Sequence, residues 1–469
     1  MSTKPIDLPS DVGEHPPRWR DLFAAPHAAA VLVMASGVAL YAMNLYFTAA
    51  LMPSIAADLG GDRYYAWAST AYLIAAVVAT MLIGRILAAR GSRGSYLIAF
   101  LLFALGTAVS AASPVMEVFV AGRAVQGLGA GMLTGLGYAT IRSVLPPSLW
   151  TRATGLVSAM FGVGTLVGPA LGGVFAQLGA WRIALAAVVV VALALILASR
   201  RALPAATGEQ GERTPLPLLS ITALALTAAL LSVSSTVTGI AAPVTALAAL
   251  ALLIAFFVID ARNPHGVLPR LAYRRGNPLA WVYLTVAALC AGVTAENFIP
   301  LFAQQLAGAT PLVAGLAGAA MSLGWTLAQL VSVSAGPIAA RWAVRIGPIV
   351  LFAGLAAYGL LQTASASGWQ LLLGAVALLV SGAGVGMAFP HLSVAAMRSG
   401  GDSGEGAKAA AAVSTTQLIA FTLASALAGN LLAWGDGSAL ASARWLIFGI
   451  AAVTLVGIPA AAMALRRRP

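Results

Sequence analysis

The chain has 469 residues, of which 60% are hydrophobic and only 9% are charged, and its mean hydropathy is +0.92. A soluble domain carries roughly 25% charged residues, so we expect most of this chain to lie in lipid. The net charge of +12 comes from basic residues scattered between apolar runs, and this scatter argues against a nucleic-acid-binding face. Composition therefore predicts an all-α integral membrane protein.

The N-terminal segment, residues 1–27, is polar and precedes an apolar run of about 25 residues. Cleavable signal sequences have apolar cores of roughly 7 to 15 residues, so this run is predicted to be a retained span. The single cysteine, Cys290, lies inside another apolar run. Neither a disulfide framework nor a thiolate metal site is therefore expected.

Apolar runs of membrane-spanning length follow one another along the chain. The first six are predicted helices that form an N-terminal bundle over residues 28–198, at 28–52, 66–87, 95–113, 118–141, 153–178 and 182–198. A polar linker at 199–217, an inserted helix pair within 218–259 and a second basic linker at 260–278 come next. The last six helices form a C-terminal bundle over 279–464, before a basic tail at 465–469; they are at 279–303, 312–335, 347–365, 370–397, 409–433 and 443–464.

Loop charge gives an independent test of this count of fourteen spans. Cytoplasmic loops attract Lys and Arg, and successive loops alternate between the two sides. With the N-terminus inside, every basic residue except Arg63, Arg182, Arg444 and the intrahelical Arg123 falls in a cytoplasmic segment. We therefore expect both termini to be cytoplasmic, and the protein to lie in the cell (inner or plasma) membrane.

The two six-helix halves also resemble each other, as in many transporters. The loop after the second helix of each half repeats one spacing, which is Gly84, Ala88 and Arg93 in the first half and Gly336, Ala340 and Arg345 in the second. This repeat marks the pair at 218–259 as an insertion between two similar bundles.

No pattern indicates an enzyme or an ATP-driven pump. The two lysines, Lys4 and Lys408, do not follow a phosphate-binding glycine loop. The four histidines are dispersed, and no nucleophile elbow occurs. We expect neither enzymatic activity nor a cofactor, so movement of a solute across the membrane remains as the function.

Two ionisable residues lie deep inside predicted helices, where a charge costs at least about 2.5 to 3.5 kcal/mol. Arg123 lies six residues inward from the boundary at Glu117, and Glu296 lies eight residues inward from Gln304 on the same side. Glu296 is a candidate proton-coupling residue, because burial raises the pKa of a carboxyl group while an approaching arginine lowers it. The alternatives are a helix-locking Arg123 and a Glu296 in a wet vestibule. Depth alone does not establish that the two residues touch.

Glycines repeat every four residues in two predicted helices. Gly127, Gly131 and Gly135 form one stripe, and Gly164, Gly168 and Gly172 form the other. Such stripes let another helix backbone approach closely. They indicate either tight packing alone or a seam that also slides during transport, and Pro169 predicts a kink.

Two further features are polar. His391 follows Pro390 near the end of the twelfth predicted helix. The two interpretations of this residue are a structural histidine and a proton relay. The basic tail and the segment from Arg18 to Arg20 are expected to contact anionic lipid headgroups.

Several segments resemble motifs of the major facilitator superfamily. The segment from Arg123 to Gly131 resembles its fourth-helix motif, whose arginine takes part in proton coupling. The segment from Gly164 to Gly173 resembles its fifth-helix antiporter motif. Residues 67–73, 300–308 and 314–316 resemble the branch of fourteen-helix drug:proton antiporters.

The sequence departs from this family at two positions. The loop motif keeps Gly84, Gly91 and Arg93 but has Ala88 where the family usually has an aspartate. The first-helix aspartate of the branch is replaced by Asn44, which does not titrate at physiological pH. Proton coupling would then depend almost entirely on Glu296, or there would be none.

The resemblance implies a two-bundle exporter that exchanges protons for a lipophilic compound by alternating access. Its expected partners are a small molecule, protons and membrane lipids, and it is expected to act as a monomer. The implied cavity between the bundles would include the proton-coupling candidates Glu296 and Arg123, and Tyr41, Asn44, Tyr46, Gln126, Asn297 and His391. The alternatives are an exporter dedicated to one metabolite or lipid, a proton-driven importer and a non-transporting scaffold or receptor.

Overall fold

The computed structural model describes residues 19–24, 27–146, 149–204, 217–264, 266–274, 276–333, 335–399 and 405–465. All regular secondary structure in these ranges is helical. Residues 1–18 of the predicted N-terminal segment, most of the linker at 199–217, and residues 466–469 of the basic tail lie outside the described residues.

The helices before the second linker are α1 (Trp19–Leu22), α2 (Ala28–Leu59), η1 (Asp62–Tyr64), α3 (Tyr65–Ala111), α4 (Met116–Ala139), α5 (Ile141–Val144), α6 (Trp150–Gln177), α7 (Trp181–Ala202), α8 (Leu218–Ser234) and α9 (Ala241–Arg262). Those after it are η3 (Arg270–Tyr273), α10 (Leu279–Val293), η4 (Thr294–Phe298), α11 (Ile299–Ala307), α12 (Pro311–Ser332), α13 (Pro337–Leu361), α14 (Gly368–Ser399), α15 (Glu405–Ala433), α16 (Ala439–Thr454) and α17 (Gly457–Ala464).

The second and third predicted helices join in α3, which kinks at Gly91. Gly91 has φ 63° and ψ −177°, a backbone conformation that residues with a side chain rarely adopt. The predicted loop between these helices is therefore reduced to a kink, and Gly84 lies inside the helix. Similarly, α13 begins at Pro337, ten residues before the predicted start of its helix at 347.

The predicted helix at 279–303 is discontinuous, and the break includes Glu296. It consists of α10, the short 3₁₀ helix η4 and α11. Pro300, at the start of α11, has no N–H to donate to the carbonyl of Glu296 four residues earlier. The α-helical ladder is therefore interrupted at the turn that carries Glu296.

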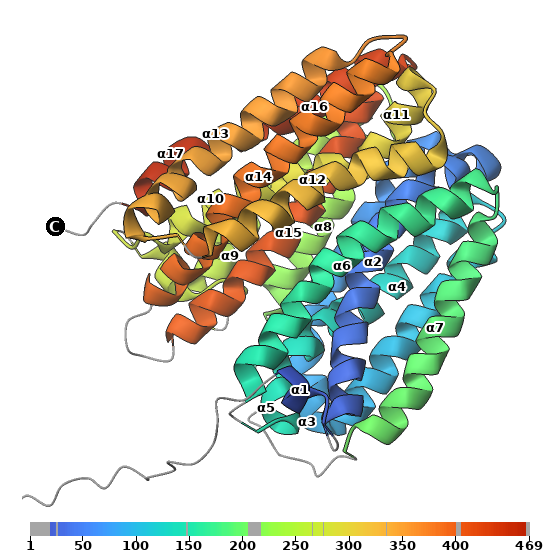
Figure 1. The fold of residues 1–469 in the computed structure, drawn as a ribbon. Helices are drawn as coiled ribbons and strands as arrows, with labels where there is room; N and C mark the ends of the chain where they lie inside the picture. The colour runs from blue at the N-terminus through green and yellow to red at the C-terminus, as the bar shows by residue number, and fades with distance from the viewer. Residues whose placement is uncertain are drawn as a thin grey trace, which may run out of the picture.

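The helices α2 to α7 gather on one side of the molecule and form the N-terminal bundle, and α10 to α17 gather on the other and form the C-terminal bundle (Figure 1). Ten helices of the described residues are long and apolar enough to cross a membrane, and α8 is a shorter apolar helix. The helices α8 and α9 pack against each other, and α8 also packs against α3 and α15. The chain is thus an all-helical, multi-pass membrane protein.

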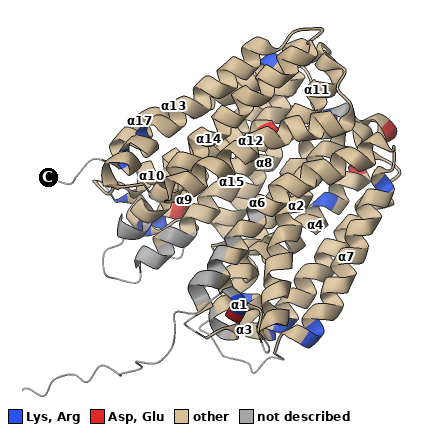
Figure 2. Cartoon of the chain, viewed as in Figure 1, with Lys and Arg blue, Asp and Glu red and all other residues tan. Residues whose placement is uncertain are grey.

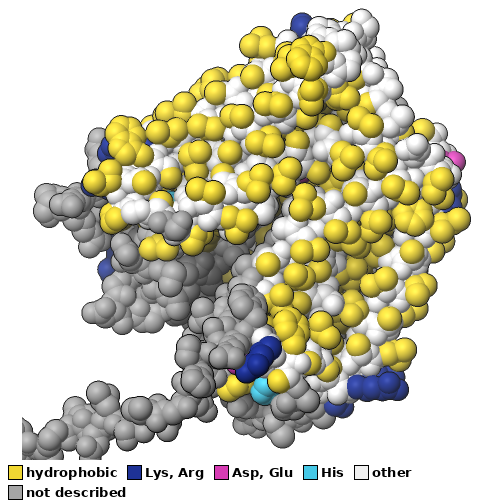
Figure 3. Space-filling view, in the orientation of Figure 1, with side chains coloured by type: hydrophobic (Ala, Val, Ile, Leu, Met, Phe, Trp, Pro, Cys, Tyr) yellow, Lys and Arg dark blue, Asp and Glu magenta, His cyan; other side chains and the backbone are white. Residues whose placement is uncertain are grey.

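Charged residues gather at the two ends of the helices, and the length between them is nearly free of charge (Figure 2). We call one the Arg182 end, because it carries Asp58, Arg63, Glu117, Arg182 and Arg444. The other, the basic end, carries Arg85, Arg90, Arg93, Arg200, Arg201, Arg262, Arg341 and Arg345. The face shown in Figure 3 is covered by apolar side chains between these ends, as expected of a surface that contacts lipid.

The two bundles meet closely at the Arg182 end. A Cβ atom added at Gly173 of α6 would lie 2.7 Å from Cα of Leu312 in α12, and one added at Gly315 would lie 2.7 Å from the carbonyl oxygen of Pro169. Both glycines therefore sit in backbone-to-backbone contacts between the bundles. Toward the basic end the two groups of helices diverge (Figure 1).

Candidate functional site

Arg123 lies in α4 with its side chain 1% exposed. Its Nη1 donates to Oδ1 of Asn44 in α2 at 2.8 Å and also to Oε1 of Gln126 one turn along α4. Its Nε donates to the carbonyl oxygen of Ala68 in α3 at 3.2 Å. The guanidinium group thus ties three helices of the N-terminal bundle together.

The contacts around Arg123 extend further on both sides. Gln126 Nε2 donates to Thr107 Oγ1 at 2.7 Å, and Thr107 Oγ1 donates to the carbonyl oxygen of Phe103. The guanidinium carbon lies 4.1 Å from the centre of the Tyr72 ring, on which the Tyr41 ring stacks at 6.2 Å. We call this group of residues the arginine cluster.

None of the hydrogen-bond acceptors of Arg123 is a carboxylate. The cation is balanced by amide and carbonyl oxygens and by an aromatic face, all of which are neutral. Such acceptors do not lose or gain a proton near neutral pH. This geometry fits the alternative of a helix-locking arginine.

Glu296 lies in η4, in the break between α10 and α11, with 3% of its surface exposed. Ser322 of α12 donates to its Oε2 at 2.8 Å. Its Oε1 is buried and has no hydrogen-bond partner among the described residues. This carboxyl group is therefore only half satisfied, which is unusual for a buried polar group.

Glu296 also lies at the interface between the bundles. The Tyr46 side chain of α2 interacts with Ser322 and Glu296 across this interface. Next to Glu296, the buried Asn297 has an Oδ1 without a partner among the described residues. The Phe298 ring lies 5.6 Å from the Tyr65 ring of α3. We call Glu296, Ser322, Tyr46 and Asn297 the glutamate site.

The predicted cavity residues therefore separate into two groups, because no hydrogen bond or ion pair joins Arg123 to Glu296 in the described chain. Asn44, Gln126 and Tyr41 belong to the arginine cluster. His391 belongs to neither group: its Nε2 lies 2.9 Å from Ser332 Oγ, between α14 and α12. That contact is typical of a structural histidine.

The glycine stripes lie within the N-terminal bundle. A Cβ atom added at Gly168 or Gly172 would lie 2.6 Å from the carbonyl oxygen of Met43 or Phe47, and Gly164 approaches the same helix, α2. Gly127, Gly131 and Gly135 face α3 in the same way. Tight packing inside one bundle explains both stripes, while Gly173 alone of the antiporter-motif glycines faces the other bundle.

The loop motif at the basic end also makes contacts within its own bundle. Arg93 Nε donates to the carbonyl oxygen of Leu203 at 2.8 Å, just past the end of α7. This bond links the kink at Gly91 to the C-terminal end of α7, where unpaired carbonyl groups favour a cation. Arg93 thus holds the kink of α3 against α7.

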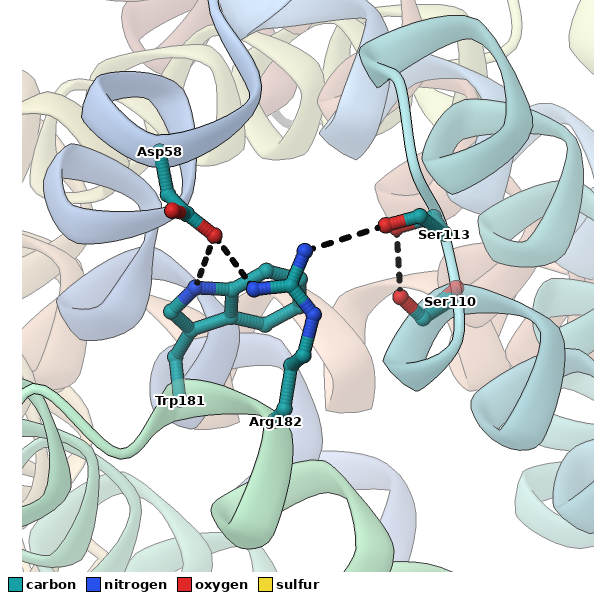
Figure 4. Close-up of polar contacts among 5 residues, drawn as sticks. All are labelled: Asp58, Ser110, Ser113, Trp181 and Arg182. Atoms are coloured by element: carbon teal, nitrogen blue, oxygen red, sulfur yellow. Dashed lines mark hydrogen bonds and ion pairs between the residues drawn. The ribbon is translucent and has the colours of Figure 1, made fainter.

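At the Arg182 end, a polar cluster joins three segments of the N-terminal bundle (Figure 4). Asp58 forms an ion pair with Arg182 and accepts from Trp181 Nε1 at 3.1 Å. Arg182 Nη2 donates to the carbonyl oxygen of Ser113 at 3.2 Å. The end of α2, the start of α7 and the turn between α3 and α4 are therefore fastened together.

A groove of about 340 Å³ lies between α2, α6 and α7, and its lining is apolar except for Ser36. It includes Gly164 but none of the residues predicted for the substrate cavity. It lies inside one bundle, so it is not the space between the bundles.

Sequence reasoning missed Ser322, Thr107 and Tyr72, which complete the two groups. Each is a polar side chain inside an otherwise apolar helix. That signal is present in the sequence, but many serines and threonines bond only to their own helix, as Thr285 does. The sequence alone does not separate the two kinds. The described residues also contain no group of three or more His, Cys, Asp or Glu side chains that could hold a metal ion.

Known proteins that are similar to this chain agree with the fold. Residues 34–407 match the family model described as Major Facilitator Superfamily. A protein of Mycobacterium tuberculosis named "Probable multidrug-efflux transporter" is 40% identical over 459 residues, which cover 96% of this chain and 97% of the relative. "Multidrug resistance protein 3" of Bacillus subtilis is 28% identical over 151 residues, covering 32% and 30% of the two chains.

Solved structures of transporters share the arrangement of helices. A D-xylose–proton symporter aligns with a TM-score of 0.67 at 16% identity, over 94% of this chain and 98% of that one. An auto-inhibited peptide transporter aligns with the same TM-score and identity, over 94% and 97%. Family and fold together show a transporter and not an enzyme. On this evidence of sequence and fold, the chain belongs to the Major Facilitator Superfamily.

Proposed function

We propose that this transporter exports lipophilic small molecules in exchange for protons by alternating access, with Glu296 carrying the proton. The observation that supports the proposal best is the position of Glu296, buried between the bundles with one oxygen unpartnered among the described residues. A carboxyl group at an interface that opens and closes changes its surroundings in each cycle. Its proton affinity changes with them, which is what coupling requires.

The contrast with Asp260 supports this assignment. Asp260 is the other buried carboxylate of the described residues. Its oxygens accept from the Val267 and Leu268 amides at 2.6 and 3.0 Å and from the Tyr273 hydroxyl at 2.9 Å. Three donors thus satisfy the Asp260 carboxylate. Glu296, with a single donor, is the group left free to exchange a proton.

We also propose the fourteen-span topology of the drug:proton antiporter branch, with α3 crossing the membrane twice and α8 and α9 crossing as an additional pair. The basic end would be cytoplasmic, since cytoplasmic loops are rich in arginine. The close contacts between the bundles at the Arg182 end would then correspond to a state that is closed to the outside. The proposed location is the cell membrane.

The proposed substrate would bind between the bundles, beside the glutamate site and the arginine cluster. Tyr41, Tyr46, Asn44, Gln126 and Asn297 supply aromatic and uncharged polar groups there. Buried walls of this kind suit a largely apolar ligand with few polar groups. The efflux relative named above adds support, because its sequence aligns over nearly the whole chain.

One proton per cycle supplies sufficient energy. A proton that enters down a potential of 100 mV supplies about 2.3 kcal/mol. Since 1.36 kcal/mol corresponds to a factor of ten, this supports a gradient of roughly fiftyfold for a neutral substrate.

Glu296→Gln tests the proposal in proteoliposomes with an entrapped pH dye, using the lipophilic dye ethidium and other unrelated dyes as substrates. In the wild type, the dye and protons should cross the membrane in opposite directions, whereas a proton-driven importer would move both in the same direction. Glu296→Gln should lose this coupling between dye movement and pH change. Glu117→Gln, which alters an exposed acid at the Arg182 end, is the matched control. Proton-coupled flux that survives in Glu296→Gln would overturn the proposal. Coupled movement of a single chemical class only would favour a dedicated exporter.

A further inference from the structure

Three helices from different parts of the chain meet at one junction near the Arg182 end. They are the start of α3 in the N-terminal bundle, the last turns of α15 in the C-terminal bundle and the end of α8. Gly429 of α15 lies at the centre: a Cβ atom added there would be 2.9 Å from Ala66 Cβ and 3.2 Å from Ser235 Oγ. The junction is therefore closed too tightly for any side chain at Gly429.

The end of α8 bonds to both bundles at this junction, but not equally. Toward α15, Ser234 Oγ donates to Asn430 Oδ1 at 2.6 Å and Asn430 Nδ2 donates to the carbonyl oxygen of Leu231 at 2.6 Å. Toward α3, the link is one hydrogen bond of 3.1 Å, from Trp67 Nε1 to the carbonyl oxygen of Ser232. The attachment of α8 to the C-terminal bundle is thus the stronger one.

The other end of the α8–α9 pair is also fixed toward the C-terminal bundle. Asp260, near the end of α9, holds Val267, Leu268 and Tyr273 in the segment that leads into α10. Burial and the adjacent Asp260 carboxylate raise the pKa of the Tyr273 hydroxyl, so the hydroxyl keeps its proton and remains a donor. Both ends of the pair therefore have firm links to the same side.

The two bundles also bond directly beside α8. Thr70 Oγ1 of α3 donates to Ser425 Oγ of α15 at 3.1 Å, and both residues are buried. For the Arg182 end to open, α3 and α15 must part here, and α8 can then remain with only one of them.

We propose that the α8–α9 pair is a third gating element, which moves with the C-terminal bundle and closes the Arg182 end by holding α3 through the Trp67–Ser232 hydrogen bond. When that end opens, Trp67 releases Ser232 while Asn430 keeps its bonds to α8. The pair also covers the seam between α3 and α15, where Val77 and Leu418 pack with Ile221 and Leu224 of α8. This inference rests on the alternating-access part of the proposed function but not on proton coupling.

Distances between spin labels test which bundle the pair follows. In a Cys290→Ala background, cysteines replace exposed residues in pairs: Arg63 for the N-terminal bundle, Thr238 for the loop between α8 and α9, and Ala433 for α15. The Arg182 end is opened without a substrate by Gly173→Trp, whose side chain does not fit against Leu312. Distances are measured in lipid nanodiscs with and without this change.

We expect opening to lengthen the distances from position 63 to 238 and to 433, while the distance from 238 to 433 stays constant. A constant distance from 63 to 238 with a longer one from 238 to 433 would overturn the proposal, because the pair would then follow the N-terminal bundle. Unchanged distances in all three pairs would also overturn it, since no release would occur.

Trp67→Phe tests the release step without the Gly173→Trp substitution. It removes the indole N–H and keeps an aromatic ring, and the loss of one net hydrogen bond changes an equilibrium by roughly two- to tenfold. We expect the population with long 63–433 distances to rise by that factor. Trp369→Phe, at an exposed tryptophan at the start of α14, is the matched control and should leave the populations unchanged. Equal populations in Trp67→Phe and wild type would overturn the proposed role of the Trp67–Ser232 hydrogen bond. Loss of proton coupling in Glu296→Gln is measured separately, so failure of either proposal is recognisable on its own.

Discussion

The two buried charges of the membrane interior have opposite surroundings. In the arginine cluster, Arg123 donates to acceptors on three helices of one bundle and lies on the Tyr72 ring. In the glutamate site, Glu296 has one donor, an oxygen without a partner among the described residues, and a position in a helix break between the bundles. The first arrangement holds a charge in one place, and the second fits the proposed exchange of a proton at Glu296. A buried ionisable residue alone therefore does not indicate coupling.

The same contrast explains the substitution of Asn44 for the family's aspartate. An aspartate beside Arg123 would be a second group able to bind a proton in the membrane interior. Asn44 accepts from Arg123 through Oδ1 but does not titrate. The chain thus has an arginine cluster that is structural in all its contacts and a single carboxyl group in the proposed coupling role.

The largest effect is expected from Arg123→Met. It leaves the acceptor oxygens of Asn44, Gln126 and Ala68 buried without their donor, at about 1–3 kcal/mol each, so we expect a loss of about 3 kcal/mol or more. The midpoint of thermal unfolding in detergent should fall by many degrees. Arg345→Met, at an exposed arginine, is the control, and a similar small change in both variants would contradict the structural role of the cluster.

Glu296→Gln should separate stability from transport. The amide oxygen still accepts from Ser322, so the unfolding midpoint should stay close to that of the wild type. Proton-coupled transport should fall at least about tenfold, since the step that binds a proton is lost. Thermal unfolding and vesicle flux are measured on the same preparation. A midpoint as low as that of Arg123→Met would make Glu296 structural and the contrast between the two sites wrong.

Much of the helical arrangement could be predicted from the sequence, because apolar runs bounded by charge reflect the thickness of the membrane. The glycine stripes also predicted close helix approach, although not that it occurs within one bundle. The joining of two helices at Gly91 and the break at residues 294–298 were not predicted. Both depend on single backbone positions, which are a positive φ at Gly91 and the missing N–H of Pro300. The hydropathy pattern contains no information about either.

The site was predicted less completely than the fold. Sequence depth located Arg123 and Glu296, and the family resemblance implied a cavity that also includes His391. Among the described residues, no hydrogen bond or ion pair joins these three to one another, because contacts depend on the rotation of each helix about its axis. A difference of one residue rotates a side chain by about a quarter of a turn. Partners such as Ser322 and Thr107 follow from that rotation and not from depth.

Gln126→Leu should have an intermediate effect. It removes an acceptor of Arg123 and the donor to Thr107, while the arginine keeps Asn44 and Ala68. We expect a loss of about 1–3 kcal/mol in the free energy of unfolding, measured as a lowered unfolding midpoint. Gln305→Leu, at an exposed position of α11, should change the midpoint much less. Equal values for the two leucine variants would show that the cluster does not act as a connected unit.

Ser322→Ala should cost less than Gln126→Leu. It removes the one donor to Glu296 among the described residues and leaves a buried acceptor unsatisfied, which costs about 1–3 kcal/mol. Gln126→Leu affects two contacts and Ser322→Ala one, so we expect the smaller loss here; transport should continue, because Ser322 does not carry the proton in the proposed cycle. A destabilisation larger than that of Gln126→Leu would mean that the glutamate site is held as firmly as the arginine cluster.

Asp58→Asn should have the smallest effect, although it breaks the ion pair with Arg182 at the Arg182 end (Figure 4). Both side chains are nearly half exposed, so water and salt screen their attraction. The asparagine oxygen still accepts from Trp181, which keeps α2 and α7 in register. The unfolding midpoint should therefore drop slightly at low salt and match the wild type in 1 M NaCl, where the screening length is about 3 Å. A drop that persists in high salt would show that this exposed cluster, like Arg123, stabilises the bundle through geometry and not through charge.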